Sequence, residues 1–278
     1  MKPPPKPDAC MPLSNPDFER LKATYPKLWV DPKRECKTCL KQNGNTYRWW
    51  ADSSRTEIAT YECDCTAQWL MHLWFLNAGI GLNYQRLTWD DVTSVDPAIV
   101  AQLGDYALNA ARRVSDGRNL VLWSSSPGTG KTLLLTLLLK TLMVQGYQVH
   151  FSQFNEIIDL FTSSWRDKAE REQWTRRVRN VDALGMDDMG KEHKGRLEMV
   201  EAMVDQIVRA RVSDSRPMAI TSNFTPQQMQ EGYGGYVMSL LSESADFIEV
   251  TGTDFRPRRR ELTAQEAALG LARPIAAV

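Results

Sequence analysis

The chain has 278 residues, 42% of them hydrophobic and 24% charged, which predicts a folded protein with one large domain or two unequal ones. Lysine and arginine together number 34, and so do aspartate and glutamate together, so the formal net charge is zero. A neutral total argues against a protein that binds nucleic acid over its whole surface, but it allows a local basic groove. The N-terminus lacks an apolar signal core, and no run approaches the ~18 apolar residues of a membrane span. We therefore expect a cytoplasmic protein without membrane contact.

Composition shifts divide the chain into four expected segments. Residues 1–31 are rich in proline and are predicted to form an N-terminal arm. Residues 32–80 hold four of the five cysteines and end in a predicted helix over 67–78, so we expect a small separate domain there. Residues 81–258 form a predicted larger domain, and residues 259–278 are expected to be a C-terminal tail.

Strand and helix patterns alternate through most of the larger domain. The segment 79–92, at the junction of the two domains, is predicted to be an extended linker. Predicted strands cover 119–124, 147–153, 181–187, 217–223 and 247–250. Predicted helices cover 97–115, 131–144, 154–164, 167–179, 196–211, 226–231 and 235–243. This alternation predicts an α/β fold with a parallel sheet that helices cover on both faces.

A phosphate-binding loop follows the first of these strands. The sequence SSPGTGKT matches the pattern G-x-x-x-x-G-K-[ST] except at its first position, where a serine is tolerated if its φ is negative. Its glycines let several backbone N–H groups face one anion, and the next helix adds its positive N-terminal end. The residues of the loop are Ser125, Ser126, Pro127, Gly128, Thr129, Gly130, Lys131 and Thr132.

The chemistry of the loop points to ATP with Mg²⁺. Lys131 is a point charge suited to the β- and γ-phosphates, and the hydroxyl of Thr132 can ligate Mg²⁺. The alternative is a glycine-rich turn between strand and helix that binds no ligand. That alternative is disfavoured because strand, loop, Gly-Lys-Thr and helix all occur in order.

Polar residues also end two later strands. The apolar run before Asp187 and Asp188 predicts that both carboxylates lie at the edge of the sheet. Asp187 would hold Mg²⁺ directly or through water, and Asp188 would orient or deprotonate an attacking water. The strand ending in Asn223 offers an amide for the γ-phosphate or its water. Asn223 could equally cap the helix that follows, since asparagine is a favoured N-cap.

Two close pairs of cysteines predict a closed, structural Zn²⁺ site. The four proposed ligands are Cys36, Cys39, Cys63 and Cys65. Four reduced thiols are the alternative, and Cys10 is left over as a free thiol. His72 could replace one ligand, although core packing fits its Trp- and Leu-rich surroundings better.

Two further segments each have two interpretations. The helix at 69–76 could pack under the cysteine domain or present an apolar face to a partner protein. The segment 163–180 could bind nucleic acid through its basic and aromatic residues, or be a solvated helix whose tryptophans pack inward. Its relevant residues are Trp165, Arg166, Lys168, Arg171, Trp174, Arg176, Arg177 and Arg179. The basic run 256–260 is a second candidate for nucleic-acid contact.

The three motifs together resemble those of an AAA+ ATPase with a P-loop NTPase core. The order MDDMG, IVRARV, RPMAITSNFTPQQM, YGGYVMSLL and GTDFR is similar to the DnaC/DnaI-like helicase loaders and to the IstB-like transposition ATPases. The resemblance covers about residues 80–258, and the cysteine cluster resembles the metal-binding head of DnaI-like and phage-type loaders. A phage or mobile-element origin also fits this compact architecture.

This resemblance implies partners and one more site residue. It implies that subunits self-associate through the ATPase domain, that the N-terminal region binds a replicative DnaB-type helicase, and that the ATPase domain binds single-stranded DNA. Arg256 matches an arginine that the family places near the end of the domain, which implies contact with the phosphates of the same subunit.

One departure from the family concerns hydrolysis. The family usually carries an arginine that reaches the ATP of the neighbouring subunit, and the matching position here is Leu240. Such an arginine is worth several powers of ten in rate. Either hydrolysis is slow, or Arg209 or Arg211 replaces it, although a cationic helix end explains both arginines more simply.

The sequence therefore supports several functions in order of preference. The first is a helicase loader with weak ATPase activity, in which ATP acts as a switch. The alternatives are an IstB-like transposition ATPase that acts on duplex DNA and an ATP-gated adaptor that hardly hydrolyses, which Leu240 favours. A small-molecule kinase ranks last because no arginine-rich lid beyond the basic helix is evident.

Overall fold

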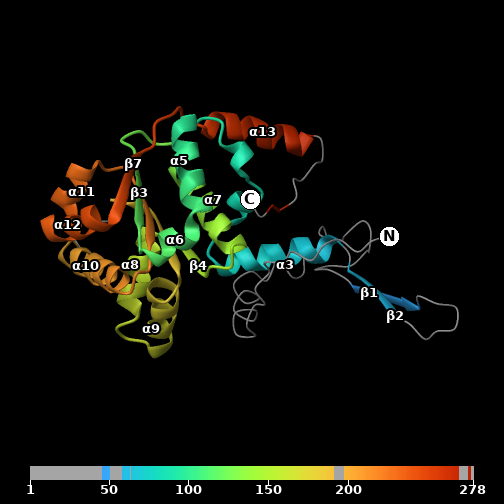
Figure 1. Ribbon diagram of the computed structural model, residues 1–278, viewed down its shortest axis with the longest axis horizontal. Helices are drawn as coiled ribbons and strands as arrows, with labels where there is room; N and C mark the ends of the chain where they lie inside the picture. Colours follow the sequence, from blue (N-terminus) through green and yellow to red (C-terminus); the bar gives the residue numbers. More distant parts are fainter. Residues whose placement is uncertain (1–45, 51–57, 63, 191–196, 269–274, 277–278) are drawn as a thin grey trace.

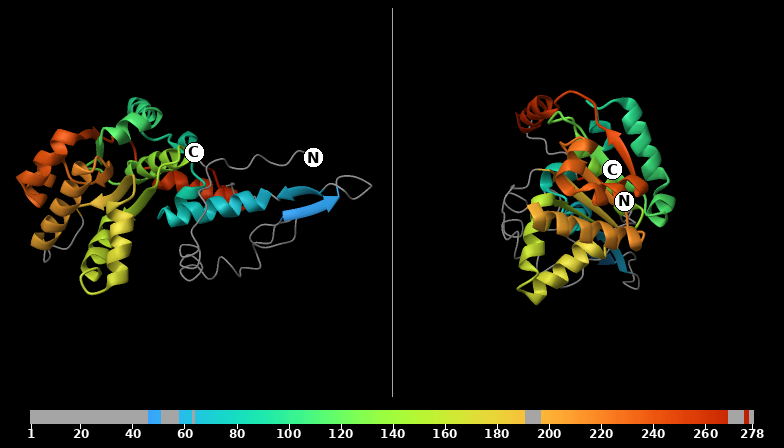
Figure 2. Two further views of the ribbon diagram at one scale, coloured as in Figure 1. Left: turned by 60° about the horizontal axis from the view of Figure 1, so that its bottom comes forward. Right: turned by 90° about the vertical axis from the view of Figure 1, so that its left-hand side faces the viewer.

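The computed structural model describes residues 46–50, 58–62, 64–190, 197–268 and 275–276 (Figure 1). Near the N-terminal end, β1 (Thr46–Trp50) pairs with β2 (Ile58–Glu62) in an antiparallel ribbon. The helix α3 (Asp64–Asn77) follows, three residues longer at its start than predicted. Figure 2 shows the ribbon at the end of α3 that lies away from the main sheet.

The main sheet has five strands in the order β4-β5-β6-β3-β7, and all neighbouring pairs are parallel. The strands are β3 (Asn119–Trp123), β4 (Val149–Gln153), β5 (Ala183–Met189), β6 (Met218–Ser222) and β7 (Ala245–Glu249). The predicted parallel α/β sheet is confirmed. Because β6 lies between β3 and β5, the carboxyl ends of these three strands meet at one edge.

The helices largely follow the predicted order. They are α4 (Leu82–Gln85), α5 (Pro97–Leu108), α6 (Ala110–Ser115), α7 (Lys131–Val144), α8 (Phe154–Ser163), α9 (Lys168–Trp174), α10 (Leu197–Ser213), α11 (Pro226–Tyr233), α12 (Gly235–Ser244) and α13 (Arg256–Ala268). A 3₁₀ turn covers Trp89–Asp91 and a π-helical turn covers Thr175–Arg179. No helix in the described part of the chain is long and apolar enough to cross a membrane.

Two predicted elements differ from the structure. The expected extended linker 79–92 is wrong, because it contains α4 and the 3₁₀ turn. The expected single helix 97–115 is interrupted at Asn109, whose side-chain amide donates to the carboxylate of Asp105 at 2.8 Å and to its carbonyl oxygen at 3.0 Å. Asparagine competes in this way with the regular helical hydrogen bonds, which explains the break.

Helices cover both faces of the sheet, as expected for parallel strands. Leu120 and Leu122 of β3 belong to the core cluster shared with α3, α5 and α7. Val121, between them, belongs to the cluster shared with α8, α10, α11 and α12. Alternate residues of β3 thus enter opposite cores, and the whole strand is buried except for its last residue.

A glycine lets α7 pack close to β5. A Cβ atom at Gly185 would lie 2.5 Å from Cδ1 of Leu139 and 3.3 Å from Cδ1 of Leu135, both on α7. Any larger residue would push the helix and strand apart unless these leucines shifted. The close approach brings the first turn of α7 next to the end of β5, where the predicted site residues lie.

Part of the expected C-terminal tail packs against the large domain. The expected domain boundary at 258/259 lies inside α13, so much of the expected tail is helical. The backbone N–H of Ala276 donates to the carbonyl oxygen of Gln85 at 3.1 Å, and Ile275 packs against the core. The N- and C-terminal flanks of the large domain therefore meet near α4.

Candidate nucleotide-binding site

The phosphate loop connects β3 to α7 and has the backbone that its sequence predicts. Gly128 and Gly130 have φ values of 81° and 93°, a region that favours glycine. Among the described residues other than glycine, only Asp188 and Ser215 have positive φ, so Ser125 meets the condition for replacing the usual first glycine. The loop therefore keeps the curled shape that directs N–H groups toward one anion.

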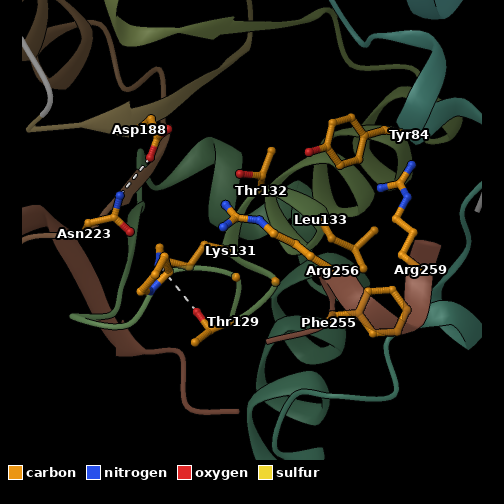
Figure 3. Close-up of a pocket in the computed structure, with 13 residues that line it drawn as sticks. Tyr84, Thr129, Lys131, Thr132, Leu133, Asp188, Asn223, Phe255, Arg256 and Arg259 are labelled. Carbon is orange, nitrogen blue, oxygen red and sulfur yellow. Dashed lines mark hydrogen bonds between the residues drawn. The ribbon is translucent and has the colours of Figure 1, made fainter. Parts of the chain in front are cut away.

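Lys131 begins α7 and is buried within the loop. Its Nζ lies 3.1 Å from the carbonyl oxygen of Ser126, 3.4 Å from that of Ser124 and 3.5 Å from Oγ1 of Thr129 (Figure 3). Lys131 also lines the pocket formed by the loop and the strand ends. These contacts hold the ammonium group within the curve of the loop, where a phosphate would compete for it.

Asp187 joins the ends of three elements through short hydrogen bonds. The hydroxyl of Thr132 on α7 lies 2.9 and 3.1 Å from its two carboxylate oxygens. The hydroxyl of Thr221 on β6 donates to Oδ1 at 2.6 Å. Asp187 is 5% exposed and Thr221 is fully buried. A hydroxyl and a carboxylate in contact offer the oxygen ligands that Mg²⁺ prefers, so these residues fit that ion.

Asp188 and Asn223 form a second pair beside the first. Asn223 Nδ2 donates to Oδ1 of Asp188 at 3.0 Å, and both residues line the pocket with Lys131 (Figure 3). Asp188 has a φ of 64°, and its N–H donates to the hydroxyl of Thr221 at 2.9 Å. A strained backbone that is held by specific bonds at a pocket is typical of a functional position.

The alternative role of Asn223 as a helix cap is wrong. The N-cap of α11 is Thr225, whose hydroxyl accepts from the N–H of Gln228 at 3.3 Å. The side chain of Gln228 accepts in return from the N–H of Thr225, which completes a capping box. The amide of Asn223 is thus directed to Asp188 and the pocket.

Helix α13 closes the pocket on another side. Its N-terminus is tied to the loop, because the N–H of Phe255 donates to the carbonyl oxygen of Gly128 at 3.2 Å. Arg256, predicted as a site residue, lines the pocket together with Phe255 and Arg259. Figure 3 shows both arginine side chains among the residues of the pocket. Sequence reasoning missed Arg259, although its spacing of three from Arg256 places both on one helix face.

Tyr84 on α4 is another pocket residue that sequence reasoning missed. The guanidinium of Arg259 lies 5.5 Å from the centroid of the Tyr84 ring. Burial and the nearby charge of Asp187 raise the pKa of Tyr84, and Arg259 opposes them. The motifs gave no signal for it, because Tyr84 lies in the segment predicted to be an extended linker.

Arg211 cannot serve as the missing arginine for a neighbouring subunit. It is fully buried, and its guanidinium donates to the carbonyl oxygens of Val178 at 2.8 Å and Pro217 at 2.9 Å. Burial lowers its pKa to about 9. Arg209 is bound to Asp205 on its own helix at 2.7 and 2.8 Å. Arg211 is therefore a structural residue that joins α10 to the loops around it.

The basic segment 163–180 exposes only one of its two tryptophans to solvent. Trp174 is buried and packs against Phe161, with their ring centroids 5.6 Å apart. Trp165 is 59% exposed and contacts the same phenylalanine edge-on. Four of the basic residues are exposed, namely Arg166, Lys168, Arg171 and Arg176. A face for nucleic acid here would therefore include Trp165 but not Trp174.

From Trp74 onward the helix at 69–76 packs into the core cluster that also contains residues of α5, α7 and β3, which differs from the predicted packing under the cysteine domain. Leu73, Trp74 and Leu76 are buried, although Leu70 is 41% exposed. His72 is also buried, with Nδ1 2.6 Å from Oε1 of Gln85. Its ring is therefore part of the contact between α3 and α4.

The cysteine cluster lies at the limit of the described structure. Cys36, Cys39 and Cys63, like Cys10, lie outside the described residues. Cys65 lies in the first turn of α3, and the ribbon of β1 and β2 separates the two cysteine pairs along the chain. In the residues that the structure covers, no three potential metal ligands cluster. The zinc site therefore stays a prediction.

The fold and the site together define an ATP-binding domain with a P-loop. In its sheet, β6 lies between β3, which precedes the loop, and β5, which carries Asp187 and Asp188 near its carboxyl end. The chain belongs to the family of IstB-like ATP-binding proteins, whose model matches residues 85–262. This match covers well over half of the chain and includes the loop, both aspartates, Asn223 and Arg256.

Two curated relatives come from Escherichia coli strain K12. The replicative helicase loader DnaC is 29% identical over 121 residues, which are 43% of this chain and 49% of DnaC. The uncharacterized protein YdaV is 26% identical over 141 residues, 49% of this chain and 56% of YdaV. The chain thus spans about half the length of the curated relatives it matches, and it is homologous to DnaC.

Solved structures share the fold at low sequence identity. The crystal structure of the DnaC helicase loader has a TM-score of 0.54 at 20% identity, covering 62% of this chain and all of that one. The crystal structure of DnaI gives 0.52 at 22% identity, with 63% and 94% covered. The replication initiator DnaA bound to AMPPCP and single-stranded DNA gives 0.52 at 17%, with 69% and 57% covered. These likenesses confirm the expected α/β fold with a parallel sheet.

Proposed function

We propose that this protein is an ATP-dependent helicase loader that binds a replicative DnaB-type helicase and helps to place it on single-stranded DNA. The observation that carries the proposal is the bonded set of Thr132, Asp187 and Thr221 beside Lys131, in a domain homologous to part of DnaC. The set supplies what a Mg²⁺–ATP site requires, and the homology supplies the class of partner.

Each side chain of the pocket has a distinct role in this proposal. The loop N–H groups and Lys131 bind the β- and γ-phosphates, and Thr132 with Asp187 holds Mg²⁺, which when bound offsets the phosphate charge. Arg256 adds positive charge from α13. Asp188 orients the attacking water and accepts its proton. Asn223 fixes the carboxylate of Asp188 by its 3.0 Å hydrogen bond and so sets where that water lies.

Slow hydrolysis follows from the position of Leu240. This residue is partly buried and packs against the core cluster of α10, α11 and α12. No arginine occurs in the sequence 234–246, and Arg211 is committed to the core. We therefore propose that ATP acts as a switch whose hydrolysis is weak. An ATP-gated adaptor with almost no turnover is the limiting case of the same proposal.

The parts of the chain that contact partners are proposed from their chemistry. The exposed Trp165 and the basic side chains around it offer stacking and phosphate contacts for single-stranded DNA. The N-terminal region would bind the helicase, folded around Zn²⁺ held by Cys36, Cys39, Cys63 and Cys65. The ribbon of β1 and β2 between the cysteine pairs supports a compact zinc-bound head. Self-association through the ATPase domain belongs to the same proposal.

One binding experiment tests the proposed loader against its alternatives. The full-length protein is mixed with a DnaB-type helicase and with single- or double-stranded DNA, in the presence of ATP or ADP, and complexes are measured by size-exclusion chromatography with light scattering. A loader binds the helicase and prefers single-stranded DNA with ATP. Indifference to the helicase together with preference for duplex DNA would instead support the transposition ATPase that the IstB-like family also suggests.

The same mixtures separate a loader from an adaptor. ATP turnover in the complex should exceed that of the Lys131→Ala variant, which lacks the loop ammonium. Leu240→Arg should raise turnover further if the site forms between subunits. Helicase binding with turnover equal to that of Lys131→Ala would establish the adaptor. Zinc is tested separately by elemental analysis of the full-length protein.

A further inference from the structure

Residues 251–255, which precede α13, pass beside the phosphate loop. Val95 and Gly252 form an isolated antiparallel bridge, and a Cβ atom at Gly252 would overlap the carbonyl oxygen of Ser94. Cγ2 of Val95 would in turn lie 3.2 Å from a Cβ atom at Gly130. The segment is therefore held by the chain that precedes α5, and that chain itself contacts the loop at Gly130.

Gly128 is the residue of the loop that meets this segment directly. The N–H of Phe255 donates to the carbonyl oxygen of Gly128 at 3.2 Å. In a trans peptide, a carbonyl group and the N–H of the next residue point in opposite directions. Holding the carbonyl of Gly128 toward Phe255 therefore holds the N–H of Thr129 on the opposite side of the same peptide. One hydrogen bond from the start of α13 thus sets the direction of a backbone donor in the phosphate loop.

Asp254 contacts both partners of this bond. Its Oδ1 accepts from the N–H of Arg256, the first residue of α13, at 3.0 Å. A Cβ atom at Gly128 would overlap the same Oδ1 and would lie 2.5 Å from Cγ of Asp254. The carboxylate of Asp254 thus caps α13 and also covers the face of Gly128 where another residue would carry a side chain. Because Phe255 lies between these two contacts, its N–H is held against the loop.

The start of α13 depends on such a cap because it is strongly basic. Arg256, Arg258, Arg259 and Arg260 lie within its first five residues. Cations near the N-terminus of a helix are unfavourable, because that end of the helix is itself positive. The turn that Asp254 caps carries Arg256 and Arg259, which line the pocket (Figure 3). The cap therefore supports the two cations that α13 brings to the site.

We propose that Asp254 is a positioning residue for the nucleotide site, whose carboxylate fixes the start of α13 against Gly128. In this arrangement the loop keeps the N–H of Thr129 directed toward the phosphates, and Arg256 keeps its place in the pocket. This inference rests on the proposed nucleotide-binding function. Asp254 acts through the backbone of the loop and through α13, without touching the nucleotide.

The test compares three variants of the full-length protein by calorimetric titration with ATP and Mg²⁺, without DNA. Asp254→Ala removes the carboxylate. Asp254→Asn keeps an oxygen that can accept from the N–H of Arg256, and asparagine caps helices about as well as aspartate. The matched control is Asp167→Ala, because Asp167 caps α9 by the same kind of bond and does not line the pocket. Its Oδ1 accepts from the N–H of Ala169 at 2.7 Å.

The expected result is that Asp254→Ala weakens ATP binding at least about fivefold, the change in an equilibrium constant that the loss of one helix cap typically produces. Asp254→Asn should stay within about twofold of the unaltered protein, because it keeps the cap. Asp167→Ala should bind ATP like the unaltered protein, although it also loses a cap. A role in stability alone would leave ATP affinity unchanged in all three variants at a temperature where they are folded.

Three results would overturn the role of Asp254. They are an unchanged affinity in Asp254→Ala, an equal loss in Asp254→Asn and an equal loss in Asp167→Ala. Thermal midpoints of the ligand-free proteins confirm that each variant is folded during the titration. Failure of the unaltered protein to bind ATP would instead overturn the proposed function.

Discussion

The two ends of helix α7 each hold a buried lysine, but the lysines do different things. Lys131 in the first turn is 7% exposed and lies in the curve of the phosphate loop, where it lines the pocket. Lys140, nine residues on, is fully buried and donates to the carbonyl oxygen of Leu87 at 2.6 Å. Its ammonium also lies 5.1 Å from the centroid of the Phe75 ring.

The difference lies in what surrounds each ammonium group. Lys131 has three contacts within the loop itself, at 3.1–3.5 Å, and the open pocket gives a phosphate access to its charge. Lys140 faces backbone carbonyls of the segment that carries Tyr84, and it is not among the pocket residues. One end of α7 is thus built for a ligand, and the other anchors the chain that helps to shape the site.

Lys131→Ala should give the largest effect, and it tests whether Lys131 binds a ligand. Loss of a charge that meets two phosphates costs about 3–4 kcal/mol, which is a loss of affinity of at least about a hundredfold. ATP binding is measured by calorimetry, with Lys168→Ala as a control at a lysine whose side chain is 90% exposed. Unchanged affinity in Lys131→Ala would refute the assignment of the loop.

Lys140→Met should have a smaller effect that appears in folding. Methionine fills similar space but cannot donate, so the carbonyl oxygen of Leu87 loses its 2.6 Å bond. A buried carbonyl left in this way costs about 2 kcal/mol. Urea denaturation measures the free energy of unfolding, with Lys168→Met as the exposed control. Equal stability of Lys140→Met and the unaltered protein would mean that the cost of burying the charge cancels its bonds.

The sequence predicted the ligand end of α7 because that end is encoded locally. The helix spans the predicted 131–144 without change, and the predicted position of Asp187 and Asp188 at the edge of the sheet follows from strands that end at one edge. A loop pattern, an apolar run and a helix signal occur in consecutive residues there, so local reasoning was sufficient. The predicted β6 likewise placed Asn223 beside the pocket.

The sequence could not predict the anchoring end, because that end depends on distant residues. The segment 79–92 has no helical period, and α4 depends on Lys140, which lies more than fifty residues later. Lys140 itself looks like a surface lysine in a leucine-rich helix. The sequence also suggested Arg211 as a replacement for the missing arginine. Its structural role could not be predicted because its carbonyl partners come from two other segments of the chain. Tyr84 was missed with the segment that carries it.

The smallest expected effect is a change in the free energy of unfolding with pH, which tests the charge state of the buried Lys140. Burial lowers the pKa of Lys140 from 10.5 to about 8, and the charge of Asp91 opposes this shift. At a pH between these two pKa values, Lys140 is protonated in the unfolded chain and deprotonated in the folded chain. The unfolded state then binds more protons, so the free energy of unfolding rises with pH by about 1 kcal/mol between roughly pH 8 and 9.5.

This rise is measured as a difference between the unaltered protein and Lys140→Met, because the other titrating groups contribute equally to both. Tyr106, whose pKa burial raises to about 12, destabilises the fold above about pH 10, and its contribution cancels in the same difference. If the difference between the two proteins stays flat from about pH 8 to 9.5, Lys140 keeps its proton in the folded state. The carbonyl oxygens around it would then stabilise the charge more than burial destabilises it, and the two ends of α7 would be electrostatically alike.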